Sequence, residues 1–208
     1  PFIGTGGHGH TFPGAVVPHG MIQPSPDTRI DGWDACSGYY YADSTINGFS
    51  HTHVSGTGCC DYGDVLLMPT VGKQQYRTTD PQSQRLAYAS SFSHKNEIAE
   101  PGYYSVFLDT YQVKAEISST KRGAIHRYTF PENAESGFII DLDYSLQRQT
   151  NSEMEIEVIS DTEICGHKKT TYWAFDQYIN FYAKFSKPFS YTLVTDSITM
   201  DNGKRLPV

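Results

Sequence analysis

The sequence predicts an all-β fold, a large antiparallel β-sandwich with little helix. Aromatic residues make up 13% of the 208 residues, with 15 Tyr and 11 Phe, and such residues are enriched in strands. From about Tyr103 onward, apolar and polar residues alternate in short segments separated by turn residues, which is typical of half-buried antiparallel strands. No stretch of two helical turns or more carries an apolar stripe.

The clearest predicted strand covers residues 138–146, where every second residue is apolar or aromatic and the two Asp residues fall on the other face. In the next one, Met154, Ile156 and Val158 alternate with three Glu residues, which predicts an acidic outer face. Further strands are predicted over 113–119, 124–130 and 178–185. Turn signals separate them at spacings typical of a sandwich, namely Pro101-Gly102, Lys121-Arg122-Gly123, Pro131-Glu132-Asn133 and Asp201-Asn202-Gly203.

The first seventy residues differ from the rest. They are rich in Gly, His, Ser, Thr and Pro, hold one of the two Trp, and lack long alternating runs. This composition predicts ordered loops that join short strands. Because binding residues concentrate on loops carried by a rigid scaffold, a site is expected in this segment.

Composition excludes several classes of function. A net charge of -7 disfavours binding to a nucleic-acid backbone. No apolar run approaches the roughly 20 residues needed to cross a bilayer, and no leader precedes Pro1, so we expect any signal peptide to have been removed. We expect residues 1–208 to form one domain that is cut near its C-terminal end within a larger protein.

The four cysteines form no C-x-x-C pair, which argues against a structural zinc site. Cys59 and Cys60 are neighbours, and a bridge between them would be strained. Free thiols or longer-range pairing are therefore expected.

A glycine-rich run, Gly4-Thr5-Gly6-Gly7-His8-Gly9-His10, lacks the Lys and Ser or Thr of a phosphate-binding loop. Its glycines serve either close approach of a ligand or tight chain packing. Both His8-x-His10 and His51-x-His53 would place two imidazoles on one face of an extended segment, as metal sites do, but the pattern nominates no third ligand. Hydrogen-bonded structural histidines are the alternative.

Two other groups suit carbohydrate chemistry. Trp33 and Asp34 put an indole and a carboxylate in one loop, and an aromatic face packs on a pyranose while carboxylates bind its hydroxyls. The alternative for Trp33 is a core residue. Asp61 and Asp64 suggest an acid/base pair, but turn or strand-end carboxylates are the commoner outcome, and spacing in sequence does not give their separation.

Several motifs in register resemble glycoside hydrolase family 92, most densely over residues 1–70. They are the opening run from Pro1 to Ala15, Pro18, Gly20-Met21, Ser25-Pro26-Asp27-Thr28, Gly32-Trp33-Asp34, Cys36-Ser37-Gly38-Tyr39, Gly48-Phe49-Ser50-His51-Thr52-His53, Ser55-Gly56-Thr57-Gly58-Cys59, Asp61-Tyr62-Gly63-Asp64, Met68-Pro69 and Pro101-Gly102-Tyr103-Tyr104. One departure is Cys60, where a small residue such as Gly is expected.

The resemblance implies an N-terminal supersandwich, similar to galactose mutarotase, followed by a C-terminal (α/α)6 catalytic barrel that is absent from this chain. It implies a calcium-dependent, inverting α-mannosidase, secreted, periplasmic or at the cell surface, that trims terminal and often α-1,2-linked mannose from glycans. The catalytic carboxylates and most calcium ligands are expected in the barrel, so no catalytic or metal-binding residue is expected here. Substrate contacts are expected at Trp33 and at Gly9 with its neighbours His8 and His10, with Asp34, His51 and His53 bracing the pocket.

Two other functions compete with this interpretation. A free-standing carbohydrate-binding sandwich would have no catalytic partner. A metal-dependent hydrolase would use the paired histidines and carry a stoichiometric transition metal.

Overall fold

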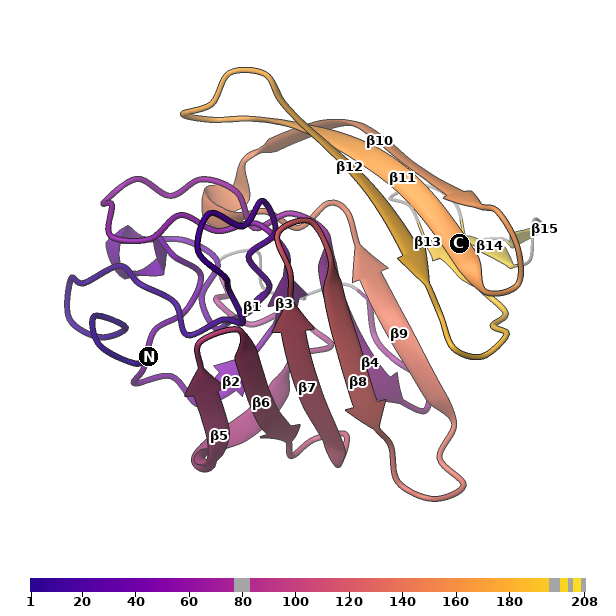
Figure 1. The fold of residues 1–208 in the computed structure, drawn as a ribbon. Helices are drawn as coiled ribbons and strands as arrows, with labels where there is room; N and C mark the ends of the chain where they lie inside the picture. Colours follow the sequence, from indigo (N-terminus) through magenta and orange to yellow (C-terminus); the bar gives the residue numbers. More distant parts are fainter. Residues whose placement is uncertain (77–82, 195–198, 202–203, 207–208) are drawn as a thin grey trace.

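The computed structural model describes residues 1–76, 83–194, 199–201 and 204–206. They form four antiparallel sheets and two short 3-10 turns (Figure 1). The first sheet has the order β1 (Ser25–Asp27), β3 (Gly48–Ser50), β4 (Leu66–Val71) and β9 (Ser136–Asp141). The second has the order β2 (Thr45–Ile46), β5 (Ser90–Glu100), β6 (Tyr103–Leu108), β7 (Val113–Ser119) and β8 (Ala124–Thr129). The third contains β10 (Thr150–Val158), β11 (Glu163–Thr171) and β12 (Gln177–Lys184), and the fourth contains β13 (Thr192–Val194), β14 (Thr199–Asp201) and β15 (Lys204–Leu206).

The first two sheets enclose the core of the sandwich. Phe49 of β3 packs on Tyr104 of β6, with ring centroids 6.3 Å apart, and on Tyr128 of β8 at 6.4 Å. The buried cluster draws alternate residues from both sheets, as period-two alternation requires. Its members include Ile46, Leu66, Met68, Val106, Leu108, Val113, Ala115 and Ile117. The predicted all-β sandwich is therefore confirmed.

Three of the predicted strands match closely. Strand β7 covers the predicted residues 113–119, β8 ends one residue before the predicted position 130, and β12 lies one residue earlier than predicted. The prediction for 138–146 was wrong in its second half, because β9 ends at Asp141. There the Asp141 carboxylate accepts hydrogen bonds from the backbone N–H groups of Asp143 and Tyr144, at 2.9 and 3.0 Å, which turns the chain. The 3-10 turn η2, Leu146–Arg148, follows.

In β10, the prediction that Met154 lies on the inner face with Ile156 and Val158 was wrong. The pairing of β10 with β11 is irregular between Ser152 and Glu155, and Glu153 has a positive φ of 51°. This bulge turns Met154 outward, so that 43% of its surface is exposed. The turn predicted at 201–203 includes residues 202 and 203, which lie outside the described residues.

The loops of the first seventy residues gather on the side of the molecule opposite β13–β15 (Figure 1). They carry only β1, β2, β3, the start of β4 and the 3-10 turn η1 (Trp33–Ala35), as the composition predicted. Within the described ranges, no helix has the length and apolar character required to cross a bilayer.

Candidate functional site

The turn η1 presents Trp33 at the molecular surface. Gly32 precedes it with a φ of 93°, a conformation that favours glycine. Two thiols hold the turn, since the Cys36 Sγ–H donates to the Trp33 carbonyl (2.9 Å) and the Cys60 Sγ–H to the Gly32 carbonyl (3.8 Å). The Trp33 side of the turn stays open, and 59% of this residue is exposed. The alternative that Trp33 belongs to the core is therefore wrong.

Two neighbours fix the orientation of the Trp33 indole. The His10 ring packs edge-on against it, with centroids 4.8 Å apart and planes at 81°. Gly58 lies so close on another side that a Cβ there would be 2.2 Å from the indole Cη2 atom. The indole is thus both exposed and held in place. Apart from the glycine-rich composition of its loop, nothing in the sequence indicated that Gly58 supports the indole.

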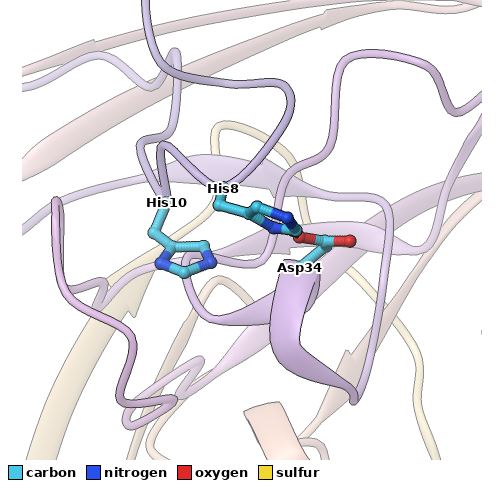
Figure 2. A group of neighbouring side chains, drawn as sticks. All are labelled: His8, His10 and Asp34. Carbon is cyan, nitrogen blue, oxygen red and sulfur yellow. Dashed lines mark hydrogen bonds and ion pairs between the residues drawn. The ribbon is translucent and has the colours of Figure 1, made fainter.

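The Asp34 side chain, on η1, contacts His8 of the glycine-rich run. Its Oδ1 lies 2.8 Å from His8 Nδ1, and its Oδ2 lies 3.9 Å from Arg29 Nη1. Arg29 itself is held by Asp43, whose two carboxylate oxygens accept from Nε and Nη2 at 2.9 and 3.0 Å. A carboxylate and an imidazole therefore stand beside the exposed indole, and Figure 2 shows His8, His10 and Asp34 together.

Gly9 is required by chain packing. A Cβ at this position would lie 2.2 Å from the Gly4 carbonyl oxygen, so no larger residue fits. The loop is closed further by hydrogen bonds from Thr11 N to the Gly4 carbonyl (3.3 Å) and from Gly56 N to the His10 carbonyl (2.6 Å). Of the two interpretations of these glycines, tight packing accounts for Gly9.

His51 lies in a different part of the fold, in a chain of polar groups between the two sheets. Its Nδ1–H donates to the Val65 carbonyl at 2.6 Å, which leaves Nε2 as an acceptor in the neutral ring. The His126 Nε2–H donates to this nitrogen at 3.2 Å, and His126 Nδ1 accepts from the Tyr128 hydroxyl at 2.8 Å. With both rings neutral, each ring nitrogen of this chain has a hydrogen-bond partner.

His53 is also structural. Its side chain is fully buried, with Nδ1 2.7 Å from the Gln23 carbonyl and Nε2 2.8 Å from Asp27 Oδ1. The two imidazoles of His51-x-His53 therefore enter separate networks. Among the described residues, the group of three His, Cys or acidic side chains placed to hold a metal ion is instead His8, His10 and Asp34.

We predict that the free energy of unfolding falls as the pH drops from 7 to 5, in part because of this histidine pair. Burial and then the charge of His51 lower the pKa of His126 to about 3, and burial also lowers that of His51. In the unfolded chain both titrate near 6.5. The unfolded state therefore binds more protons below pH 6.5, and stability decreases until about pH 3. At pH 5 the loss is about 2 kcal/mol for one histidine.

Urea unfolding between pH 5 and 7 measures this effect. The variant His126→Gln should have a weaker dependence on pH than the parent, whereas His19→Asn, at an exposed histidine, should keep the parent dependence. Other ionisable groups facing His51, namely His53 and Asp27, remain in both variants. Equal pH dependence in His126→Gln and the parent would contradict the assignment.

Asp61 and Asp64 hold the β10–β12 sheet rather than forming an acid/base pair. Asp61 Oδ2 accepts from the backbone N–H of Ala174 at 2.9 Å. Asp64 is fully buried, 3.1 Å from Lys168 Nζ, and its Oδ2 accepts from Thr52 and Gln177 at 2.7 and 2.9 Å. All four cysteines are free thiols.

Comparisons with known proteins give one consistent result. Residues 1–206 match the family model described as the glycosyl hydrolase family 92 N-terminal domain. A family GH92 α-mannosidase from Bacteroides thetaiotaomicron, solved alone and in complex with mannoimidazole, is 40% identical with a TM-score of 0.85, over 90% of this chain and 25% of that chain. The GH92 family glycosyl hydrolase CcMan5 is 28% identical with a TM-score of 0.67, over 86% of this chain and 24% of that chain.

A curated relative from Arthroderma benhamiae, described as an uncharacterized secreted glycosidase, is 32% identical over 134 residues, which are 63% of this chain and 17% of the relative. The chain thus spans a quarter or less of the length of these relatives.

Proposed function

The chain belongs to the glycosyl hydrolase family 92 N-terminal domain family, and from this premise we propose that it is the N-terminal domain of an exo-acting, inverting α-mannosidase. The enzyme would remove terminal mannose from glycans, with the α-1,2 linkage as the expected one. This domain would supply one wall of the mannose pocket, and a C-terminal (α/α)6 domain would supply the other. The identity of 40% to a mannosidase solved with mannoimidazole supports the substrate class.

The observation that carries the proposal is the exposed Trp33 indole with polar groups at its edge. A pyranose has an apolar C–H face and a rim of hydroxyl groups, and it is bound by an aromatic plane flanked by hydrogen-bonding side chains. Trp33 provides the plane, and Asp34 and His8, which contact each other at 2.8 Å, provide hydrogen-bonding groups close by. His10 and Gly58 keep the plane in a fixed orientation, which reduces the entropy lost on binding.

In the proposed mechanism, the chemistry is carried out by carboxyl groups of the C-terminal domain. One carboxylic acid protonates the leaving oxygen, and one carboxylate activates water on the opposite face of the sugar, as inverting glycosidases require. Trp33 and its polar neighbours orient the sugar and exclude water from the pocket. Because Asp61 and Asp64 are engaged in structural contacts, neither is assigned a catalytic role.

Calcium is part of the proposal only through the C-terminal domain. Calcium takes six to eight oxygen ligands, and when bound it would supply charge that holds sugar hydroxyls and distorts the ring. The group His8, His10 and Asp34 offers two imidazoles and one carboxylate. This donor set does not fit calcium, so no step is assigned to calcium on this chain.

The runner-up is a free-standing carbohydrate-binding module, since an exposed aromatic residue such as Trp33 also suits that function. Comparing the isolated chain with the full-length protein separates the two. We predict that residues 1–208 alone release no mannose from an α-1,2-linked dimannoside and bind mannose only weakly, whereas the full-length protein releases mannose. Mannose release is measured by chromatography.

Hydrolysis by the isolated chain would refute the division of labour between the domains. Tight mannose binding by the isolated chain, together with no mannose release by the full-length protein, would favour the binding module. We further propose a secreted, periplasmic or cell-surface location, which the description of the Arthroderma relative as secreted supports.

A further inference from the structure

The His10 imidazole is buried with one nitrogen lacking a partner. This residue is 8% exposed, and within the part of the chain that the structure describes its Nε2 has no hydrogen-bond partner. Its backbone has a positive φ of 51°, its carbonyl accepts from Gly56 N at 2.6 Å, and its ring is packed against Trp33. The contact with Trp33 restrains the ring. Buried polar groups without partners are rare and destabilising, so a missing ligand is the physical explanation to test.

His8 and Asp34 face this nitrogen. One ligand atom from each of His8, His10 and Asp34 lies within 4.8 Å of the others. Figure 2 shows one ring nitrogen of His10 on the side where His8 and Asp34 lie. Two imidazoles and a carboxylate converge here from two segments, residues 8–10 and the turn η1.

We propose that His8, His10 and Asp34 bind a divalent transition-metal ion of the zinc class. Zinc is bound by neutral imidazoles at about 2.0 to 2.1 Å and by carboxylates at a similar distance, so its ligand atoms lie about 3.5 Å from one another. His8 Nδ1 and Asp34 Oδ1, now 2.8 Å apart, must therefore separate slightly, and ligand atoms that lie farther apart, up to 4.8 Å, must approach. His8 can make this movement because 74% of its side chain is exposed. The ion would replace the proton that His8 Nδ1 and Asp34 Oδ1 share at 2.8 Å.

The surroundings determine what kind of site this is. Three protein ligands leave a coordination position open, as in zinc sites that bind water or substrate. The Arg29 guanidinium, 3.9 Å from Asp34, opposes a cation, but its charge is balanced by the Asp43 carboxylate, to which it donates three hydrogen bonds. The site shares His8 and Asp34 with the proposed sugar pocket, and its test measures binding of the metal alone, without a sugar.

A calorimetric titration of residues 1–208 with Zn²⁺ tests the proposal. The visible absorption spectrum of the Co²⁺-bound chain reports the ligand geometry. We expect one Zn²⁺ per chain, not displaced by excess Ca²⁺. His8→Gln and Asp34→Asn should each weaken binding at least about tenfold, since loss even of a second-shell partner has an effect of this size. Both side chains are partly exposed, so these variants should fold even if His10→Asn does not. The matched control His19→Asn should bind as the parent does.

A second group of side chains that could bind Zn²⁺ lies on the third sheet and offers the clearest result against the proposal. Glu157 pairs with Cys165 and Glu155 with His167 on the outer face of the third sheet. If Cys165→Ser removes Zn²⁺ binding while His8→Gln preserves it, the proposal is overturned. It is equally overturned if the parent chain binds no Zn²⁺.

Discussion

Replacing Trp33 by alanine in the full-length protein is expected to lower kcat/KM for an α-1,2-linked dimannoside by about 100-fold, a size typical of lost substrate positioning. The indole provides the fixed apolar plane of the proposed sugar pocket, and alanine leaves the pyranose free to shift. Stability should change little, because 59% of Trp33 is exposed. Steady-state kinetics and a thermal unfolding curve measure the two quantities separately.

Gly58→Ala tests the same plane without removing it. A Cβ at Gly58 would lie 2.2 Å from the indole, so Trp33 must move, and a loss of about tenfold in kcat/KM is expected. Gly123→Ala is the matched control, because a Cβ there meets nothing closer than 3.8 Å. If Trp33→Ala retains parent kinetics within about threefold, a difference below 1 kcal/mol, the indole has no part in the sugar pocket.

How much of the fold could be predicted depended on whether alternation reported burial. It did so in residues 113–119 and 178–185, where the apolar residues at every second position are the more buried ones in β7 and β12. It failed for β5, which was not predicted, because the bulge between Phe92 and Glu97 brings the Glu97 carboxylate inside. There it accepts from the hydroxyls of Tyr39 and Tyr104 at 3.0 and 2.7 Å, so a charged residue occupies a core position.

The candidate site was predictable as a set of residues but not as a geometry. The order of motifs pointed to Trp33, His8 and Asp34, and the structure brings these three into one loop cluster. The separation of 26 residues between His8 and Asp34 carries no distance information, and no local pattern distinguished His10, beside the indole, from His51, which lies between the sheets. Tertiary packing makes that distinction.

Removing the buried cation Lys168 is expected to lower the free energy of unfolding by about 3 to 5 kcal/mol, as when one partner of a buried ion pair is lost. Lys168, on β11, is fully buried with Asp64, and its Nζ lies 3.1 Å from Asp64 Oδ1 and donates to the Tyr144 carbonyl at 2.7 Å. Lys168→Met keeps most of the side-chain volume but leaves the Asp64 carboxylate buried beside an apolar group. Urea unfolding at pH 7 measures the change.

The double variant Lys168→Met/Asp64→Asn separates the effect of charge from that of packing. An amide at position 64 can still accept from Thr52, so the double variant should recover part of the loss, since a neutral pair avoids the uncompensated charge. Lys184→Met in the same sheet removes an exposed ion pair with Glu163, 2.8 Å long, and should change stability by less than about 1 kcal/mol. Equal losses in the two single lysine variants would mean that Lys168 does not hold the third sheet to the loop at Asp64. A larger loss at Lys168 would instead show that its buried contacts with Asp64 and Tyr144 stabilise the packing of the third sheet on the sandwich, although the polar sequence around Lys168 does not predict a buried residue.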